Sequence, residues 1–521
     1  MHNLHNIATK HNVKDREIGK TLGADGFIST MDSFWFSISS DIVINPFDFV
    51  TVGHILNTRT IGIVKELQAN DVVGTAARVA VMANTGRENI SGKVVPIAMP
   101  VKPAKSVRFA TEKEVIFALG IPLMENPIPA GVIEMTNGLE VPVSLDISYL
   151  LGPDTAHVNA AGISGNLKTS YLFFLLHSAH QTLVKARRID DAAIVIFNTK
   201  EEDLLHIGEK RKAKNNAKKL FDLLDLEIKP FVNVTYFLPR GRDGKPNSAV
   251  IPENSKTYSF ELQDVYDRLE LLFGNSDDSY NTSSILNFIY EAWPLTSEGK
   301  RLRTWSDLSN FRSYPPEVVK FKSTLLRFLG HLQRFRKSPM FIDQRITSTY
   351  LGKEIKNIRP GDVFVIDIAM VPTLEEQSFV VGDVMKSIDE LYSARQVAQK
   401  ARYVLIFVDE INRFIPHSGG RRSAVAEHIM RTIVTGRSRG TILFSAQQFK
   451  STVDSSLHEG TGMHIIAKLG MNELSAPPYS MIDESTKAHI VRLNKGELVM
   501  VHPALRHPIK ITFPKVPFKT G

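Results

Sequence analysis

The sequence predicts a small β-barrel or sandwich in its N-terminal part, followed by an α/β domain with a buried parallel sheet. Between about residues 25 and 125, short segments rich in valine, isoleucine and phenylalanine are separated by glycine, proline, asparagine and aspartate. Several short strands at this spacing are typical of barrels and sandwiches. From about residue 147, longer apolar runs alternate with helical patterns. Such alternation is typical of parallel strands that are covered by helices.

The expected strands of the N-terminal part lie between residues 34 and 120. They read FWFSISSDIVI, FVTVGHIL, TIGIVKELQ, AARVAVMAN, KVVPIAMPV and EVIFALG. Residues 25–125 are therefore assigned to the barrel, and the polar residues 1–24 to a poorly ordered lead. Residues 126–146 are rich in proline and glycine and are expected to form a linker.

The α/β domain is expected in two segments, residues 147–208 and 346–515. Its apolar strands read TAHVNAAG, AAIVIFNTK, DVFVIDIAMV, YVLIFVDEI and GTILFSAQQ. Residues 209–345 show helical patterns, notably PPEVVKFKSTLLRFLGHLQRFRK, and are expected to be a helical insertion. Residues 516–521 are expected to form a short tail.

Composition excludes several classes of protein. Apolar residues make up 43% of the 521 residues and charged residues 23%, which is ordinary for a soluble globular protein. No apolar run is long enough to cross a membrane, and the polar N-terminus does not read as a secretory signal. The absence of cysteine excludes disulfides, cysteine-based zinc sites and thiol catalysis, and no clustered histidine motif predicts zinc. We expect a cytoplasmic protein, and its net charge of +8 is compatible with nucleic-acid binding.

One stretch, GISGNLKTSY at residues 162–171, nearly matches the phosphate-binding pattern G-x-x-x-x-G-K-[ST]. An apolar strand precedes it and a helical pattern follows it. Phosphate binding requires this placement, because loop N–H groups and a helix N-terminus attract anions. Leu167 stands where the second glycine is usual, and the alternative is a glycine-containing turn that binds no ligand. The candidate phosphate-binding residues are Gly162, Ser164, Gly165, Asn166, Leu167, Lys168, Thr169 and Ser170.

The acidic pair Asp409-Glu410 ends the apolar run YVLIFV. In open α/β sheets, ligands bind at the carboxyl ends of the strands. Lys168 would then reach the phosphates, Thr169 and Asp409 would hold Mg²⁺, and Glu410 would polarise the attacking water. The alternative is that the acidic pair caps the helix that follows.

The run GTILFSAQQ ends in Gln447-Gln448, where many ATPase cores keep a polar group that senses the γ-phosphate. Arg437 and Arg439 lie just before this run. Either arginine is a candidate finger, because a guanidinium stabilises charge on a phosphoryl group during its transfer. The alternative is a solvated basic turn.

Five segments, taken in order, resemble the HerA family of hexameric DNA-translocating ATPases, which are relatives of FtsK. They read VNAAGISGNLKTS, AAIVIFNTKEEDLL, PGDVFVIDIAMV, VLIFVDEINRF and TGRSRGTILFSAQQ. The resemblance covers about residues 25–515. It implies an N-terminal barrel of the ATP-synthase type, a RecA-like P-loop ATPase core and a helical insertion. It also implies ATP and Mg²⁺ as cofactors.

The resemblance also implies site roles. Lys168 and Thr169 match the Walker A residues, Asp409 and Glu410 match the Walker B residues, and Gln447 matches the sensor.

Three positions matter for how closely the chain follows the family. Arg437 best matches the arginine finger that a neighbouring subunit supplies, with Arg439 second. Leu167 departs from the family's glycine. Archaeal members often carry an arginine shortly before the loop, where this chain offers only His157.

Basic clusters at residues 208–219 and 327–337 are expected to be solvated helix faces or subunit contacts. Arg421 and Arg422 are better DNA candidates, because translocase rings present loops to the pore after the acidic strand. Contacts of this kind would be independent of DNA sequence and sensitive to salt.

The favoured interpretation is an ATP-hydrolysing homohexameric ring that moves duplex DNA. By resemblance it would work with a separate effector, such as a nuclease or a sirtuin-like NAD hydrolase, in bacterial defence against phage, and not with a membrane. The alternative is a ring scaffold that assembles and activates the effector, with ATP binding mainly structural, and Leu167 keeps this alternative open. A rotary ATP synthase subunit fits less well, because the segment between Lys168 and Asp409 is too long.

Overall fold

The chain folds into two compact units. The computed structural model describes residues 16–23, 26–71, 73–151, 156–163, 165, 168–185, 192–211, 215–273, 282–297, 299–393, 401–417 and 422–519. The first unit contains the described part of Met1–Asp146 together with Ile466–Ser475 and Tyr479–Phe513. The second contains the described parts of Ile147–Ile465 and Pro514–Gly521, with Ala476–Pro478. The first unit is thus assembled from both ends of the chain.

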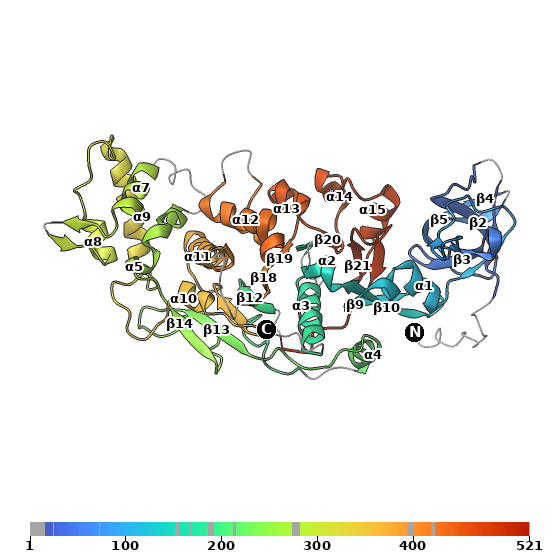
Figure 1. Cartoon of the computed structure of the whole chain (residues 1–521), viewed down its shortest axis with the longest axis horizontal. Helices are drawn as coiled ribbons and strands as arrows, with labels where there is room; N and C mark the ends of the chain where they lie inside the picture. The colour runs from blue at the N-terminus through green and yellow to red at the C-terminus, as the bar shows by residue number, and fades with distance from the viewer. Residues whose placement is uncertain are drawn as a thin grey trace, which may run out of the picture. The chain divides into compact units, whose positions relative to one another are not determined.

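A closed barrel forms the N-terminal part of the first unit (Figure 1). Its strands pair antiparallel in the order β1-β2-β5-β4-β3-β8. They are β1 (Gly19–Thr21), β2 (Ser33–Ile38), β3 (Phe49–Gly53), β4 (Arg59–Asn70), β5 (Gly74–Asn84) and β8 (Ser106–Phe109). The prediction of an N-terminal barrel is confirmed. The expected lead is wrong over β1, because this strand pairs with both β2 and β8 and so closes the barrel.

The remaining elements of the first unit correct two further expectations. They are η2 (Ile55–Asn57), β6 (Arg87–Glu88), β7 (Val94–Val95), α1 (Glu112–Ala118), η3 (Ile121–Leu123), β9 (Pro127–Glu134), β10 (Glu140–Asp146), α14 (Met471–Leu474), α15 (Glu484–Ile490), β21 (Leu498–Val501) and β22 (Ile509–Ile511). EVIFALG, expected as a strand, is helix α1, because Thr111 and Glu114 form a capping box at its start. The expected linker is an antiparallel pair, β9 and β10, and Val132 of β9 bridges to Thr512.

A parallel sheet forms the centre of the second unit. Its strands follow the order β14-β13-β17-β12-β18-β19-β11-β20, and the pairs from β14 to β11 are parallel. They are β11 (Val158–Ala161), β12 (Ala192–Asn198), β13 (Val234–Pro239), β14 (Ser255–Tyr258), β17 (Val363–Asp367), β18 (Tyr403–Val408), β19 (Thr441–Gln447) and β20 (Met463–Ile466). The predicted buried parallel sheet is confirmed.

The expected helical insertion, residues 209–345, is not purely helical. Its buried run VTYFLP forms β13, which pairs with β17, and β14 forms the edge beside it. The helices and short strands of the second unit are α2 (Ile147–Leu151), α3 (Lys168–Lys185), α4 (Asn215–Leu223), α5 (Leu262–Val265), η5 (Tyr266–Phe273), α7 (Ser283–Ala292), β15 (Thr296–Ser297), β16 (Lys300–Arg301), α8 (Trp305–Asn310), α9 (Lys322–Arg336), α10 (Leu351–Lys356), α11 (Leu374–Ser393), η6 (Ile411–Arg413), α12 (Ala424–Arg439), η7 (Lys450–Thr452) and α13 (Ser455–Glu459). The short η8 (Pro477–Tyr479) follows α14. No helix within the described ranges has the length and apolarity needed to cross a membrane.

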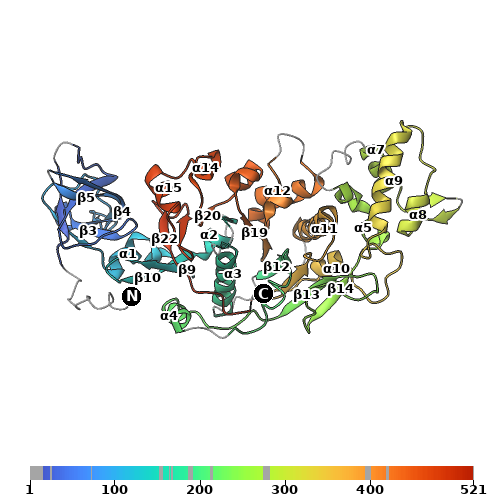
Figure 2. The ribbon, with the colours of Figure 1, turned by 180° about the vertical axis from the view of Figure 1, so that it is seen from behind.

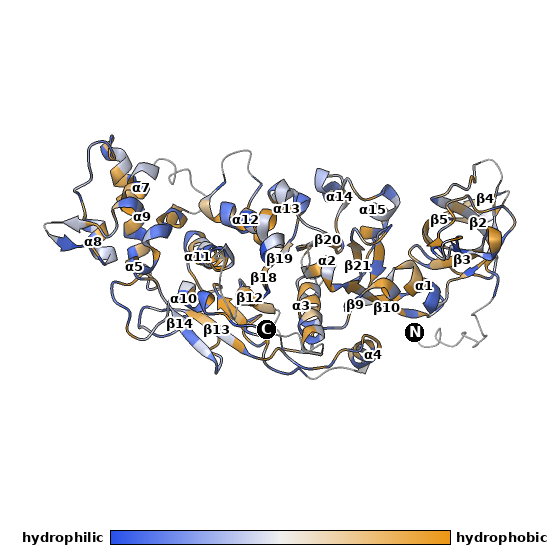
Figure 3. Ribbon diagram, viewed as in Figure 1, coloured by the Kyte–Doolittle hydropathy of each residue, from blue (hydrophilic) through white to orange (hydrophobic). Residues whose placement is uncertain are grey.

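Helices cover both faces of the sheet (Figures 1 and 2). On one face, Val195, Ile406 and Leu443 belong to the same buried cluster as residues of α11 and α12. On the other face, the ring of Phe407 lies 4.3 Å from that of Phe173 in α3, centroid to centroid. Strands buried on both faces are nearly uniformly apolar, and β13 is accordingly largely orange in Figure 3, whereas the edge strand β14 is paler. This packing fixes the carboxyl ends of β11, β12, β18 and β19 along one edge.

Candidate functional site

The phosphate-loop candidate joins β11 to α3. Gly162, just after β11, donates its N–H to the Gln448 carbonyl at 3.1 Å, which ties the start of the loop to the end of β19. Gly165 has a φ of 81°, a left-handed conformation that favours glycine. Helix α3 then begins at Lys168. Of the predicted loop residues, Ser164, Asn166 and Leu167 lie outside the described residues.

The first turn of α3 presents the two side chains with the most specific predicted roles. Lys168 is buried, and burial lowers the pKa of its ammonium, while the charge of Asp409 acts in the opposite direction. The Thr169 hydroxyl donates to Asp409 Oδ2 at 3.2 Å. Ser170 is half-buried in the same turn. The helix start and the acidic strand therefore meet, although 240 residues separate Thr169 from Asp409.

The acidic pair follows β18 directly. Asp409 is 3% exposed, and its Oδ1 accepts the N–H of Glu410 at 2.9 Å. Glu410 has a φ of 49° and a ψ of 48°, a left-handed conformation that costs a residue with a side chain about 1–2 kcal/mol. Its side chain makes no cap to η6, so capping of the following helix does not explain Glu410. Such strained positions cluster at active sites and switch regions.

Lys200 is the site residue that sequence reasoning missed. Its Nζ lies 2.9 Å from Asp409 Oδ2 and 3.2 Å from Glu410 Oε1. Burial lowers the pKa of Lys200, but the charges and hydrogen bonds of the two carboxylates outweigh burial and leave this pKa raised. In the sequence, Lys200 is visible only as a lysine two residues beyond the buried run AAIVIFN. Only the pairing of β12 with β18 places this lysine beside the acidic pair.

Gln447, the predicted sensor, is the last residue of β19 and is fully buried. Its Nε2 donates to Asn159 Oδ1 at 2.8 Å, and its Oε1 accepts from Asn159 Nδ2 at 2.8 Å. Asn159 also donates to Ser445 Oγ at 2.9 Å. The two amides thus clamp β11 to β19 directly beneath the loop.

The two candidate finger arginines lie in the last turn of α12 and not in a basic turn outside it. Arg439 pairs with Asp389 of α11. The side chain of Arg437 lies outside the described residues. Cations in the last turn of a helix are stabilised by the helix dipole, so both positions also have a local structural explanation.

Of the DNA candidates and the residue before the loop, Arg422 and His157 are described, and each is held by neighbouring groups. Arg421 lies outside the described residues. Arg422 forms a two-pronged pair with Asp454, at 2.7 and 2.9 Å, while its side chain stays 40% exposed. His157 is buried, with Nδ1 accepting from the Leu443 N–H at 3.0 Å and Nε2 lying 3.1 Å from the Ile433 carbonyl. His157 therefore serves the packing of β11.

The side chains that meet at this edge suit a nucleotide with Mg²⁺. The Thr169 hydroxyl and the Asp409 carboxylate are hard oxygen donors, the kind of ligand that Mg²⁺ prefers. A left-handed glycine, a helix N-terminus and the Lys168 ammonium suit phosphate oxygens. Glu410, with 27% of its side chain exposed, is the acidic group with access to solvent.

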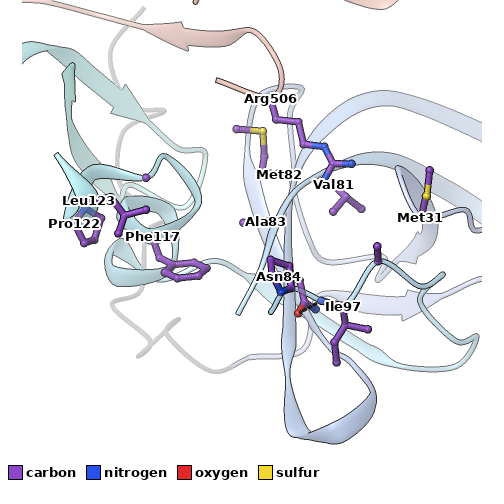
Figure 4. Close-up of a pocket in the computed structure, with 13 residues that line it drawn as sticks. Met31, Val81, Met82, Ala83, Asn84, Ile97, Phe117, Pro122, Leu123 and Arg506 are labelled. Atoms are coloured by element: carbon purple, nitrogen blue, oxygen red, sulfur yellow. Dashed lines mark hydrogen bonds between the residues drawn. The ribbon is translucent and has the colours of Figure 1, made fainter. Parts of the chain in front are cut away.

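The first unit has a pocket of a different kind (Figure 4). It measures about 350 Å³ and lies between β5 and the segment around η3. Its lining residues are Met31, Val81, Met82, Ala83, Asn84, Pro96, Ile97, Ala98, Phe117, Gly120, Pro122, Leu123 and Arg506. These include no carboxylate, histidine or hydroxyl, and the single charged group, Arg506, pairs with Asp32 at 2.5 Å. The pocket therefore offers no acid–base chemistry.

Comparison with known proteins gives distant structural likenesses. No protein-family profile matches the sequence, and neither does any curated protein. The bacterial conjugative coupling protein TrwBdeltaN70 is similar over 68% of this chain and 84% of its own, with 12% identity and a TM-score of 0.42. VirB4 of Thermoanaerobacter pseudethanolicus is similar over 75% of this chain and 96% of its own, with 14% identity and a TM-score of 0.43.

Proposed function

We propose that the chain hydrolyses ATP with Mg²⁺ at the carboxyl edge of the central sheet. The observation that carries this proposal is the contact between Thr169 and Asp409. It joins a glycine-containing loop and helix start to a strand that ends in an acidic pair. A glycine turn without a ligand would not need a hydroxyl, a lysine and two carboxylates at one point.

Each side chain has a role in the proposed reaction. Lys168 and the N–H groups at the start of α3 hold the phosphates, and Ser170 lies beside them. Thr169 and Asp409 are the Mg²⁺ ligands, and bound Mg²⁺ would neutralise phosphate charge. Glu410 takes the proton from the attacking water.

The sensing and finger roles belong to other elements. Gln447 ends β19 and would sense the γ-phosphate through the amide N–H that does not bind Asn159. The finger in trans is Arg437, with Arg439 second, because Arg439 already pairs with Asp389. A finger of this kind requires a neighbouring subunit at every site, and a closed ring supplies one.

The motor we infer is a cytoplasmic homohexamer of the HerA type that moves duplex DNA, with the basic segment at Arg421 and Arg422 facing the DNA. The order of five sequence segments and the barrel that precedes the parallel sheet support this interpretation. By the same resemblance, the ring works with a separate nuclease or NAD hydrolase in defence against phage.

The second candidate function is a ring scaffold that activates the effector, with ATP binding mainly structural. Leu167 favours it, because a side chain there changes the loop on which turnover depends. The ATPase rate with and without duplex DNA separates the two functions. A motor is stimulated by DNA, whereas a scaffold binds ATP with little turnover.

Two variants and one size measurement test the proposal. Lys168→Ala should abolish binding of a fluorescent ATP analogue, and Glu410→Gln should keep binding but stop turnover. Lys256→Met is a matched control, because Lys256 pairs with Glu354 at 2.9 Å away from the site residues. Wild-type protein that binds no nucleotide would overturn the proposal. If mass photometry shows only monomers, with or without ATP, the proposal that the chain forms a ring is wrong.

A further inference from the structure

Lys200 bridges the two carboxylates of the acidic pair. The register pairs Phe197 of β12 with Val408 of β18, so the residues that follow the two strands emerge side by side. Lys200 reaches both Asp409 and Glu410 from there, at 2.9 and 3.2 Å, with 44% of its side chain exposed. The exposure leaves room for the ammonium to move, because a long side chain that is half in solvent is not locked by packing.

Both oxygens of the Asp409 carboxylate accept hydrogen bonds from neighbours within the described residues. Oδ2 accepts from both Lys200 and Thr169, and Oδ1 accepts from the Glu410 N–H. A divalent cation held by Asp409 and Thr169 would need the same oxygen that now binds the Lys200 ammonium. Two cations close to one carboxylate repel each other, so the ammonium and the divalent cation compete.

The charged side chains around Asp409 include Lys168, Lys200 and Glu410, and also Asp203, whose pKa responds to both Lys200 and Asp409. The two ammonium groups repel a free divalent cation at Asp409, whereas a divalent cation with a polyphosphate brings its own negative charge. The two lysines therefore favour the cation–nucleotide complex over the free cation.

We propose that Lys200 is a positioning residue that competes with the divalent cation for Asp409 and so couples cation binding to nucleotide binding. This inference rests on the proposed function of the site. With the nucleotide complex bound, Asp409 would hold the divalent cation in place of Lys200, and the Lys200 ammonium would stay beside Glu410 and the phosphates. Lys200 thereby discourages the site from holding Mg²⁺ without a nucleotide.

The test measures binding of Mn²⁺, a spectroscopic substitute for Mg²⁺, to the full chain without nucleotide. Electron paramagnetic resonance reports free Mn²⁺ during the titration. Lys200→Met removes the charge and keeps most of the stem, so it should tighten Mn²⁺ binding by about tenfold or more, because it removes a positive charge from beside the carboxylate that would hold the cation. Lys200→Arg keeps the charge and should bind Mn²⁺ as weakly as the wild type.

Lys256→Met is the matched control, because Lys256 also pairs with one carboxylate at 2.9 Å and is similarly exposed, at 50%. It should leave Mn²⁺ affinity unchanged. Equal Mn²⁺ affinity in the wild type and Lys200→Met would overturn the competition, as would an arginine variant that behaves like the methionine variant. If Lys200→Met does not fold, Lys200→Gln replaces it.

A second titration separates failure of this inference from failure of the proposed function. The fluorescent ATP analogue is titrated with and without Mg²⁺. In the wild type, Mg²⁺ and the analogue should strengthen each other's binding, and this coupling should shrink in Lys200→Met. A wild-type protein that binds no analogue contradicts the ATPase proposal. A wild type that binds it, with coupling unchanged in Lys200→Met, contradicts only the role of Lys200.

Discussion

Replacing Gln447 with methionine, which has a similar length, should destabilise the second unit through the amide pair. The change removes both bonds to Asn159 and leaves one N–H and Oδ1 of Asn159 without a partner, at a place where both side chains are fully buried. Each unsatisfied buried group costs about 1–3 kcal/mol. The apolar side chain offsets part of this cost, and we expect a net loss of about 2–4 kcal/mol.

The assay is a double-mutant cycle followed by differential scanning calorimetry. A loss of 2–4 kcal/mol should lower the thermal midpoint of a unit of this size by about 3–6 °C. Asn159→Leu keeps the shape of the side chain, and the double variant leaves neither amide stranded. The double variant should therefore be more stable than the sum of the single effects by about 1–3 kcal/mol.

Strictly additive effects would refute this reasoning, because they would mean that the two amides contribute independently. The cycle also isolates the sensor role. Asn159→Leu breaks the pair but keeps Gln447, so it should retain more ATPase activity than Gln447→Met when both are compared below their thermal midpoints. Equal activities would leave Gln447 with a purely structural role.

Three further changes have defined outcomes. Burial lowers the pKa of both His177 and His180 to about 4. Between about pH 6.5 and 4 the unfolded chain therefore binds more protons than the folded chain, and the free energy of unfolding should decrease as the pH is lowered, by about 1.4 kcal/mol per pH unit for each histidine. His177→Gln should remove one such slope in calorimetry. Arg422→Gln should lose the ion pair with Asp454. If Arg422 faces DNA, the variant should also make the plot of log affinity against log salt concentration less steep by about 0.9 per subunit, as measured by filter binding. Leu167→Gly should lower the thermal midpoint without raising ATPase activity more than about tenfold, and a stable variant hundreds of times faster would favour the scaffold.

The elements around the site were predictable because each has a local signal. The apolar run before Gly162, the lysine and threonine that start α3, and the acidic pair after YVLIFV are all visible in the sequence. Parallel strands bring their carboxyl ends to one edge, so the meeting of Thr169 and Asp409 follows from the fold class.

Features that depend on pairing were not predictable. Lys200 enters the site only through the register of β12 with β18. The three-residue strand β1 is too short to show alternation and is held by both its neighbours. Helix α1 reads as a strand by composition, and its capping box outweighs the β-branched residues.

The expected linker shows the opposite error. Its prolines and glycines favoured irregular structure, yet Val141, Val143 and Leu145 are buried at alternate positions of β10. Alternation over seven residues is a strand signal that composition concealed.

The assembly of the first unit from both ends of the chain has a consequence for synthesis. Lys65 of β4 is buried, and its Nζ donates to Thr486 Oγ1 at 3.0 Å and to Asp483 Oδ2 at 3.4 Å. Asp483 emerges from the ribosome 418 residues after Lys65, which at common rates is about 20–80 s later. During that interval the nascent barrel carries an ammonium group without its native partners, and the ring of Phe47 lacks the ring of His489 that packs against it in the folded unit. A chaperone that binds this barrel early and releases it only after residue 486 has been made would keep the barrel bound until Lys65 can form its contacts with Asp483 and Thr486.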